Sequence, residues 1–291
     1  MSRLVAAAVA LSACIATSSR LAAVEPAASA DDQARAVIVR ALAAGNASNQ
    51  AAVLAKLAWP DGKRDEAVAA RARRELANSG DHAFVALREA LNTVKPAYAE
   101  EVVAATLAAA RASRPEMVWP YVTVMIDALW VGSHGAKLLA IEALSVDHTA
   151  LAVGPMIDSA IDDPSLLPAT VQALGAMRYQ QARFFLEKVM MEGPADVRPM
   201  AASSLAQIGG AALGPLKNAL KAPTVNARLL AARALLPAAT EYDLGAIYEY
   251  LEKHGDDDPG VSQALRASAV TIEKAIAARD AKAAADSPKD F

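Results

Sequence analysis

The sequence predicts an all-α fold, an α-solenoid superhelix of about seven antiparallel helix pairs. Three observations favour it. A helical pattern of apolar residues recurs along the chain with a period near 30 residues. Alternation of apolar and polar residues, which would indicate strands, is nearly absent. The chain is 54% hydrophobic but only 4% aromatic, a composition that suits closely packed, alanine-rich helices better than one large core.

The repeat is clearest between Asp196 and Ala222, where the pattern predicts two helices joined by Gly209-Gly210. Pro199 falls in the first turn of the first helix, where its missing N–H does no harm, and glycine tolerates the left-handed backbone that ends a helix. Each helix carries a single apolar stripe. One pair cannot bury both stripes alone, so similar pairs must stack on either side.

A leucine near the end of each first helix gives the register of the repeat. These residues are Leu42, Leu76, Leu107, Leu144, Leu174, Leu205 and Leu235. The matching second-helix series is Leu57, Leu91, Leu129, Ile161, Val189, Leu220 and Leu251. Four units also carry a basic residue seven positions before the leucine: Arg35, Lys137, Arg198 and Arg228. This register predicts units at about 31–61, 62–94, 95–131, 132–163, 164–193, 194–222 and 223–255.

The units differ in character along the chain. The first is expected to be a polar N-terminal cap, and the first helices of the first two units should end at Gly45 and Gly80. The third unit is longer and contains most of the aromatic signal, whereas the last four are regular. Asp256-Asp257-Asp258 is interpreted as a stretch of solvated cap or turn residues. A final helix, Val261–Ala278, should close the domain, and residues 279–291 are expected to be a disordered tail.

Several of these motifs resemble a known repeat family. Asp196-Val197-Arg198, Ala201-Ala202 and Leu205-Ala206 resemble the HEAT repeat, in the short form found in phycobilisome-lyase-like repeat proteins. Ala173-Leu174-Gly175 resembles the preceding copy, and Arg228 with Ala231-Ala232 the next one. A HEAT-like solenoid is therefore expected over residues 31–278, with the strongest resemblance over 133–255. The resemblance implies a protein-binding scaffold, and it does not imply lyase activity.

Residues 1–30 predict an export signal followed by a tether. Arg3 precedes the uncharged apolar run from Leu4 to Ala13, as in a secretory signal. Leu11-Ser12-Ala13-Cys14 resembles the bacterial lipobox, in which the cysteine is acylated and becomes the new N-terminus. Cys14 is the only cysteine of the chain, and it is predicted to be a lipid anchor in the cell envelope, facing the periplasm. A soluble secreted protein cleaved after Ala30, and a protein without export, remain alternatives.

Composition and motifs exclude several functions. Lys+Arg 29 against Asp+Glu 32 offers no basic field for nucleic acid, and contact with a membrane is expected only through the anchor. The histidines are His82, His134, His148 and His254, with no pair at i, i+4 and no cysteine partner. They are interpreted as surface residues. The sequence therefore predicts no catalytic residues, no metal site and no cofactor.

One aromatic stripe is predicted to bind a partner. Trp119, Thr123, Asp127 and Trp130 fall on one side of the second helix of unit three, because 11 residues are nearly three turns. Aromatic residues beside polar ones are favoured at interaction hot spots. The competing interpretation is that both tryptophans fill an irregular joint between the two halves of the solenoid. Four further aromatic residues are expected in the core: Phe184, Phe185, Tyr248 and Tyr250.

These observations predict a non-enzymatic cell-envelope scaffold that holds another protein. The resemblance implies that the second helices line the concave face and contact the partner there. Polar positions expected on that face are Arg88, Asp127, Asp158, Glu187, Lys217 and Glu249. Their mixed signs argue against a strongly charged ligand. Two alternatives remain: a lyase-associated enzyme or enzyme accessory factor of the HEAT-like type, and a purely structural spacer.

Overall fold

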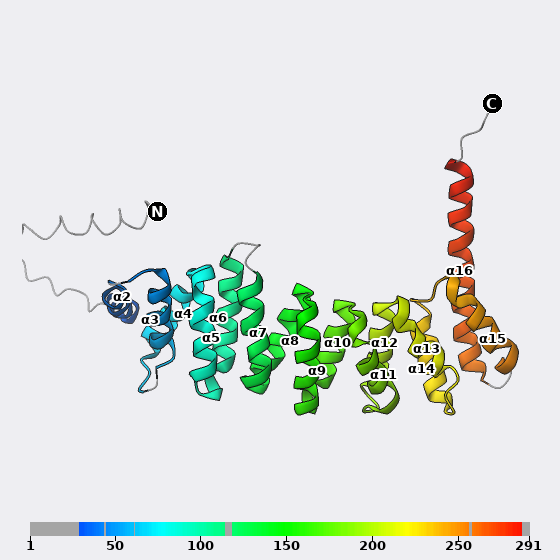
Figure 1. Cartoon of the computed structure of the whole chain (residues 1–291), viewed down its shortest axis with the longest axis horizontal. Coiled ribbons are helices and arrows are strands. Elements are labelled where there is room, and N and C mark those ends of the chain that lie inside the picture. Colours follow the sequence, from blue (N-terminus) through cyan, green and yellow to red (C-terminus); the bar gives the residue numbers. More distant parts are fainter. Residues whose placement is uncertain (1–28, 44, 61, 114–117, 256–257, 287–291) are drawn as a thin grey trace, which may run out of the picture.

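The structure is a computed structural model that describes residues 29–43, 45–60, 62–113, 118–255 and 258–286. The described part is all-helical, with short 3-10 turns and no strand. The helices stand side by side in one long row (Figure 1). Neighbours along the chain pack in pairs, an arrangement compatible with an α-solenoid. None of the described helices is both long enough and apolar enough to cross a membrane.

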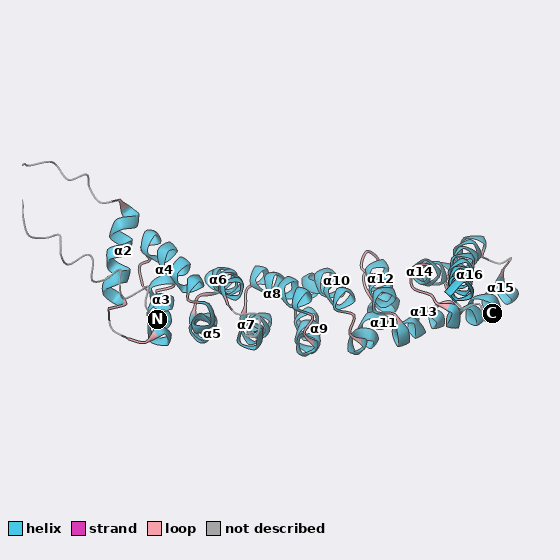
Figure 2. Ribbon diagram, turned by 90° about the horizontal axis from the view of Figure 1, so that it is seen from above, coloured by secondary structure: helices cyan, strands magenta, loops and turns pink. Residues whose placement is uncertain are grey.

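The helices form two layers, visible from above in Figure 2. The first layer consists of α2 (Ala30–Ala41), α4 (Glu66–Asn78), α6 (Ala99–Ala112), α8 (His134–Asp147), α10 (Leu167–Met177), α12 (Arg198–Ile208), α14 (Val225–Leu235) and α16 (Pro259–Asp286). The second layer consists of α3 (Ala47–Ala58), α5 (Ala83–Thr93), α7 (Val118–Val131), α9 (Val153–Asp162), α11 (Arg183–Glu192), α13 (Leu213–Ala219) and α15 (Leu244–His254). Each first-layer helix packs against the next one in its layer.

Left-handed residues mark the turns from the first layer to the second. The backbone after α12 has φ of 67° at Gly209 and 54° at Gly210, as the Gly-Gly turn predicts. The residues that follow α8 and α10, His148 and Arg178, adopt φ of 49° and 58° although neither is glycine. His148, Arg178 and Gly209 follow directly on a first-layer helix, and Gly210 is the next residue after Gly209. A left-handed residue at this place redirects the chain from the first-layer helix into its partner helix.

The predicted leucine positions of the first layer are correct in five units and wrong in two. Five of the leucines are completely buried: Leu76, Leu144, Leu174, Leu205 and Leu235. Leu42 and Leu107 are only partly buried, and the core positions of their units belong to Ile38 and Thr106. Thr106 is tolerated there because its hydroxyl donates to the carbonyl of Val102, at 2.8 Å. Leu265 of α16 continues the series 30 residues after Leu235, so α16 occupies the place of another first-layer helix.

The second-layer series is wrong in α9 but correct at Val189 of α11, whereas Leu57 and Leu251 are only partly buried. Ile161 is 63% exposed, and the neighbouring Ala160 is buried in its place. Next to it, buried Ser159 donates from Oγ to the carbonyl of Leu129 in α7, at 3.2 Å. Phe184, expected in the core, is 69% exposed and stacks under the guanidinium of Arg183 instead. Tyr248 is also exposed, whereas Phe185 is partly buried and Tyr250 is buried as expected.

A glycine allows the closest approach between two first-layer helices. A Cβ atom placed at Gly175 of α10 would lie 2.5 Å from Ser204 Oγ and 2.8 Å from Ser204 Cα. Ser204 is buried in α12, and its hydroxyl donates to the carbonyl of Val171 at 2.8 Å. The lack of a side chain at Gly175 therefore brings α12 close enough for a hydrogen bond between adjacent units.

An ionic network joins the helices at the N-terminal end. The Glu101 carboxylate of α6 accepts hydrogen bonds from Trp59 Nε1 at 3.0 Å, Arg64 at 2.9 Å and Arg73 at 2.6 Å. The Arg64 guanidinium also lies over the Tyr98 ring, 4.7 Å from its centroid. These donors come from the end of α3, the following loop and α4. One carboxylate thus connects the first three units.

A second network closes the C-terminal end. Arg228 of α14 and Asp258 form an ion pair at 2.6 Å, and Tyr250 donates to the same carboxylate at 3.1 Å. Asp258 is 6% exposed, so the expectation that it is solvated is wrong, whereas Asp256 and Asp257 lie outside the described residues. The burial of Asp258 is tolerated because its carboxylate is paired with the Arg228 guanidinium and also accepts a hydrogen bond from the Tyr250 hydroxyl.

Asp243 belongs to the same end of the row. It accepts a hydrogen bond from Lys217 at 2.9 Å and further bonds from the Thr240 hydroxyl and backbone N–H. Burial alone would raise the pKa of Asp243, but these hydrogen bonds outweigh it and hold the pKa below its usual value. Between residues 128 and 216 of the described chain, His134–Asp163 is the only ion pair, so ionic contacts between elements concentrate towards the two ends.

The last helix is longer than the sequence pattern predicts. α16 continues to Asp286, beyond the expected end at Ala278, so residues 279–286 are helical rather than disordered. Alanine, the best helix former, dominates this stretch and explains the continuation without an apolar stripe. The final part of α16 projects away from the row of helices (Figure 1). Residues 287–291 lie outside the described part.

Candidate protein-interaction surface

The outer face of the second-layer helices carries a stripe of side chains directed away from the core. In α7, buried Met125 is flanked at −2, +2 and +5 by Thr123, Asp127 and Trp130. At 100° per residue these positions lie on the side of the helix opposite Met125. The corresponding residues of α11 are Phe184, Lys188 and Met191, around buried Leu186. The stripe predicted for one helix is therefore a feature of the repeat.

The structure brings together three of the four residues predicted to bind a partner. Thr123, Asp127 and Trp130 share the outer face of α7, whereas the Trp119 side chain lies outside the described part. Thr123 is already engaged, since its hydroxyl donates to the carbonyl of Pro120 at 2.7 Å. Trp130 is 50% exposed, so half of the ring surface is open to solvent.

Asp127 forms an ion pair with the neighbouring second-layer helix. Arg88 of α5 donates from Nε to Asp127 Oδ2 at 2.5 Å and from NH2 to Oδ1 at 3.3 Å. This hydrogen bond raises the pKa of the Arg88 guanidinium. The two-point contact fixes both side chains beside Trp130, where they form a polar rim. Of the other polar positions expected on this face, Lys217 and Glu249 are also paired, with Asp243 and Lys253.

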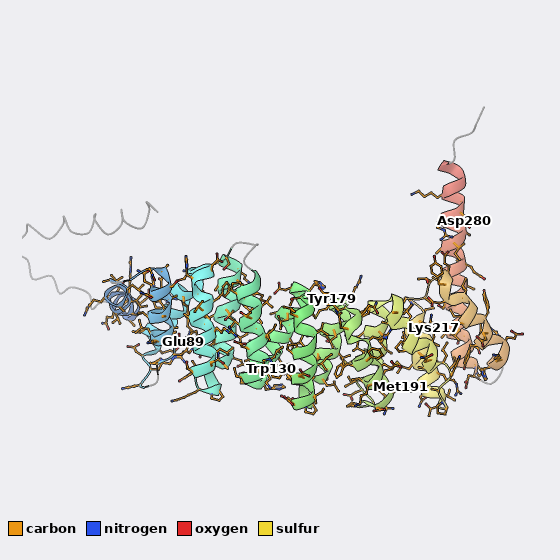
Figure 3. All side chains as sticks on the ribbon, viewed as in Figure 1. Glu89, Trp130, Tyr179, Met191, Lys217 and Asp280 are labelled. Carbon is orange, nitrogen blue, oxygen red and sulfur yellow. The ribbon has the colours of Figure 1, made fainter. Side chains whose placement is uncertain are left out.

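Three exposed apolar side chains form a row across adjacent units. Trp130, Ile161 and Met191 lie near the C-terminal ends of α7, α9 and α11, at the same position of the repeat. They are 50%, 63% and 43% exposed, and Val131 adds another half-exposed side chain beside Trp130. Figure 3 shows Trp130 and Met191 along the same edge of the molecule. We call Trp130, Ile161 and Met191 the apolar row.

The charges near the apolar row are predominantly acidic. Asp158, Asp162 and Glu192 are exposed on α9 and α11, and none of them forms an ion pair within the described chain. The two basic residues of α9 and α11 are Arg183 and Lys188. Arg183 stacks on the Phe184 ring, whereas Lys188 is exposed and has no partner among the described residues. The exposed side chains without a partner on these two helices are therefore three carboxylates and one ammonium group. The surface has the apolar centre and charged rim of a protein interface.

Sequence reasoning found Trp130 but missed Ile161 and Met191. It searched for aromatic residues and placed Ile161 in the core. The signal was available, because Ile161 and Met191 follow Trp130 at intervals of 31 and 30 residues. Aligning whole units on Trp130 would have revealed Ile161 and Met191 at the same position of the repeat.

One cluster brings together the residue types of a serine hydrolase. His134 Nδ1 lies 3.0 Å from Asp163 Oδ2 and 3.2 Å from Ser165 Oγ. Hydrogen bonds from Ser165 and His134 lower the pKa of Asp163 to about 2. In a catalytic triad the serine and the aspartate contact opposite ring nitrogens, whereas here both contact Nδ1. The geometry fits a cap, because Asp163 also accepts from the backbone N–H of Ser165 at 3.1 Å.

Within the described chain, no group of three or more His, Cys, Asp or Glu residues could hold a metal ion. Cys14, the predicted lipid anchor, lies outside the described residues. Comparison with known proteins adds no assignment: no family model matches the sequence, and a search of curated proteins finds no match.

Proposed function

We propose that the protein is a non-enzymatic scaffold that holds another protein against the outer face of its second-layer helices. The apolar row carries this proposal. Exposed apolar side chains scattered singly are ordinary, but here they recur at one repeat position on three successive second-layer helices. Trp130 is the residue of the row best suited to anchor a partner, because tryptophan is enriched at hot spots.

The proposal extends the architecture beyond the observed pairing of helices. We infer about seven antiparallel helix pairs, similar to HEAT repeats, that wind into a right-handed superhelix and end in α16. The fully buried leucines and the left-handed turns at one repeat position support this inference. The row of helices curves only slightly in Figure 2, so binding is assigned to the second-layer face itself rather than to a deep concave groove.

The apolar row suits a partner helix that lies across α7, α9 and α11 and turns an apolar stripe towards them. Lysine or arginine beside that stripe would match the carboxylates of Asp158, Asp162 and Glu192.

The proposed location is the cell envelope, with a lipid anchor at Cys14 and the solenoid facing the periplasm. The signal-like residues 1–14 and the lipobox-like Leu11-Ser12-Ala13-Cys14 support this location. Replacement of Cys14 by serine should abolish incorporation of a labelled fatty acid and association with membranes. Retention of both properties by the variant would contradict the anchor, and a secreted soluble form would favour the alternative cleavage after Ala30.

The binding proposal is tested by chemical crosslinking in native envelopes with a triple variant, Trp130→Ala, Ile161→Ser and Met191→Ser. The matched control replaces two exposed apolar residues outside the row, Val146→Ser and Leu151→Ser. We expect the triple variant to lose the crosslinked partner while its melting temperature stays within the range of the control.

Two results would contradict the proposal. Equal partner capture by the triple variant and the control would exclude the apolar row as the interface. A large loss of stability without loss of partner would favour the packing role of Trp130. A cofactor that purifies with the native protein, or turnover of a substrate, would favour the alternative of a lyase-associated enzyme or accessory factor.

A further inference from the structure

A groove on the first layer, on the opposite side of the molecule from the apolar row, contains unpaired arginines. It lies between α12 and α14 beside the end of α10 and encloses about 820 Å³. This volume falls within the range of about 300–1,000 Å³ that is usual for small-molecule sites. Nothing in the sequence pattern pointed to it.

Every polar side chain that lines the groove can donate hydrogen bonds, and the lining contains no carboxylate. Arg178 follows α10, Ser203 and Gln207 come from α12, and Asn226 and Arg233 come from α14. Both arginines are exposed, and neither forms an ion pair or a side-chain hydrogen bond within the described chain. Both lie near C-terminal ends of helices, where the helix dipole favours a positive charge. The dipole explains why each helix end carries an arginine. It does not explain why the groove that both arginines line contains no aspartate or glutamate.

The remaining lining is apolar and made of small or aliphatic side chains. It includes Ala206 of α12 and Leu229 and Leu230 of α14. Leu229 and Leu230 are partly buried, so they offer apolar surface to the groove while they pack on the core. A mostly apolar cavity with a few polar groups is the usual design of a ligand site.

We propose that this groove binds an amphiphilic organic anion. The acidic head group, a carboxylate or a phosphate, would contact Arg178 and Arg233, because a guanidinium pairs with either group through two parallel hydrogen bonds. The apolar body would lie along Ala206, Leu229 and Leu230. The groove and the apolar row belong to different layers, so this site does not depend on the proposed partner surface.

Two fluorescent probes with the same apolar body separate the contributions of charge and apolar contact. These are 1-anilinonaphthalene-8-sulfonate, which carries a negative charge, and N-phenyl-1-naphthylamine, which lacks it. In the full-length protein, the double variant Arg178→Gln, Arg233→Gln should weaken the Kd of the anionic probe at least tenfold, about 1.4 kcal/mol. The neutral probe should change less than twofold. The matched control is Arg40→Gln, which alters an exposed arginine of α2 outside the groove.

A second variant and two competitors complete the test. Ser203→Trp fills the groove while both arginines remain, and it should also weaken the anionic probe at least tenfold. Decanoate and decyl phosphate compete for the probe: displacement by the first identifies a carboxylate ligand, and displacement by the second a phosphate ligand. The proposal is overturned if the double variant binds the anionic probe like the parent, if both probes weaken equally, or if neither competitor displaces the probe. Circular dichroism verifies that each variant is folded.

Discussion

Replacement of Gly175 by alanine should destabilise the protein although alanine is the better helix former. The new Cβ would lie 2.8 Å from the Cα of Ser204, a backbone atom that cannot rotate away. Ser204 Cβ, which the backbone also fixes, would lie 2.7 Å away, and ordinary contact begins near 3.4 Å, so α12 must retreat by about 0.7 Å. A shift of this size would also stretch the hydrogen bond from Ser204 Oγ to the carbonyl of Val171, which is 2.8 Å long.

The magnitude follows from two opposing effects. Overpacking of a close contact typically costs about 1–3 kcal/mol, and loss of the hydrogen bond adds about 1 kcal/mol. The gain in helix propensity offsets about 1 kcal/mol. The net loss is therefore about 1–3 kcal/mol, which lowers the melting temperature by about 2–4 °C per kcal/mol in a chain of this size.

Gly245→Ala provides the matched control. Gly245 also lies in a helix, α15, but a Cβ there meets no atom within 4 Å. Only the propensity effect then remains, so this variant should be more stable by up to about 1 kcal/mol. Thermal and urea denaturation followed by circular dichroism at 222 nm would measure both variants. If Gly175→Ala is as stable as Gly245→Ala, the close approach of α10 and α12 does not exist.

Three further predictions concern the core and the ionic contacts. Leu205→Asp places a charge at a position with 0% exposure and should cost about 3 kcal/mol or more in urea denaturation, whereas Gln207→Asp, exposed on the same helix, should change stability by about 0.5 kcal/mol at most. Asp258→Ala removes the ionic partner of the partly buried Arg228, which keeps only its hydrogen bonds to the carbonyls of Ala222 and Pro223, and should cost about 1.5–3 kcal/mol. Faster hydrogen exchange in α16 would reveal this loss, and unchanged exchange, as expected for the exposed Asp162→Ala, would contradict it. The lowered pKa of Asp243 stabilises the fold fully above pH 4, and this contribution disappears as the pH falls through the folded pKa. Asp243→Asn should therefore show a weaker decline in melting temperature between pH 4 and pH 2 than the parent, and an identical decline would refute the assignment.

The helices and most of their register could be predicted because apolar periodicity reports which side of a helix is buried. Two of the failures, those in α6 and α9, share one physical cause. Thr106 and Ser159 are buried with their hydroxyls bonded to backbone carbonyls, so a pattern based on apolar residues alone passes over them. In α9 this moved the predicted core position by one residue, from Ala160 to Ile161. Such a shift rotates a helical side chain by 100°, enough to exchange a buried place for an exposed one.

The two candidate sites differ in how far the sequence could reveal them. Trp130 was predicted because tryptophan at helical spacing is conspicuous, and the rest of the apolar row could be read from the repeat. The groove between α12 and α14 could not be predicted from the sequence, because it depends on the distance between the two packed helices. Arg178 and Arg233 are 55 residues apart in the chain, and only the packing of three units brings both to one cavity.

The concentration of ionic contacts at the two ends gives the protein an uneven response to salt. Exposed pairs such as Arg74–Asp31 and Arg279–Glu241 lose much of their attraction as ions screen them. The central units are joined chiefly by apolar side chains and hydroxyl-to-carbonyl bonds, on which screening has little effect. Rising ionic strength would therefore loosen the ends of the rod first, so that fraying proceeds inward while the segment that contains the apolar row stays assembled.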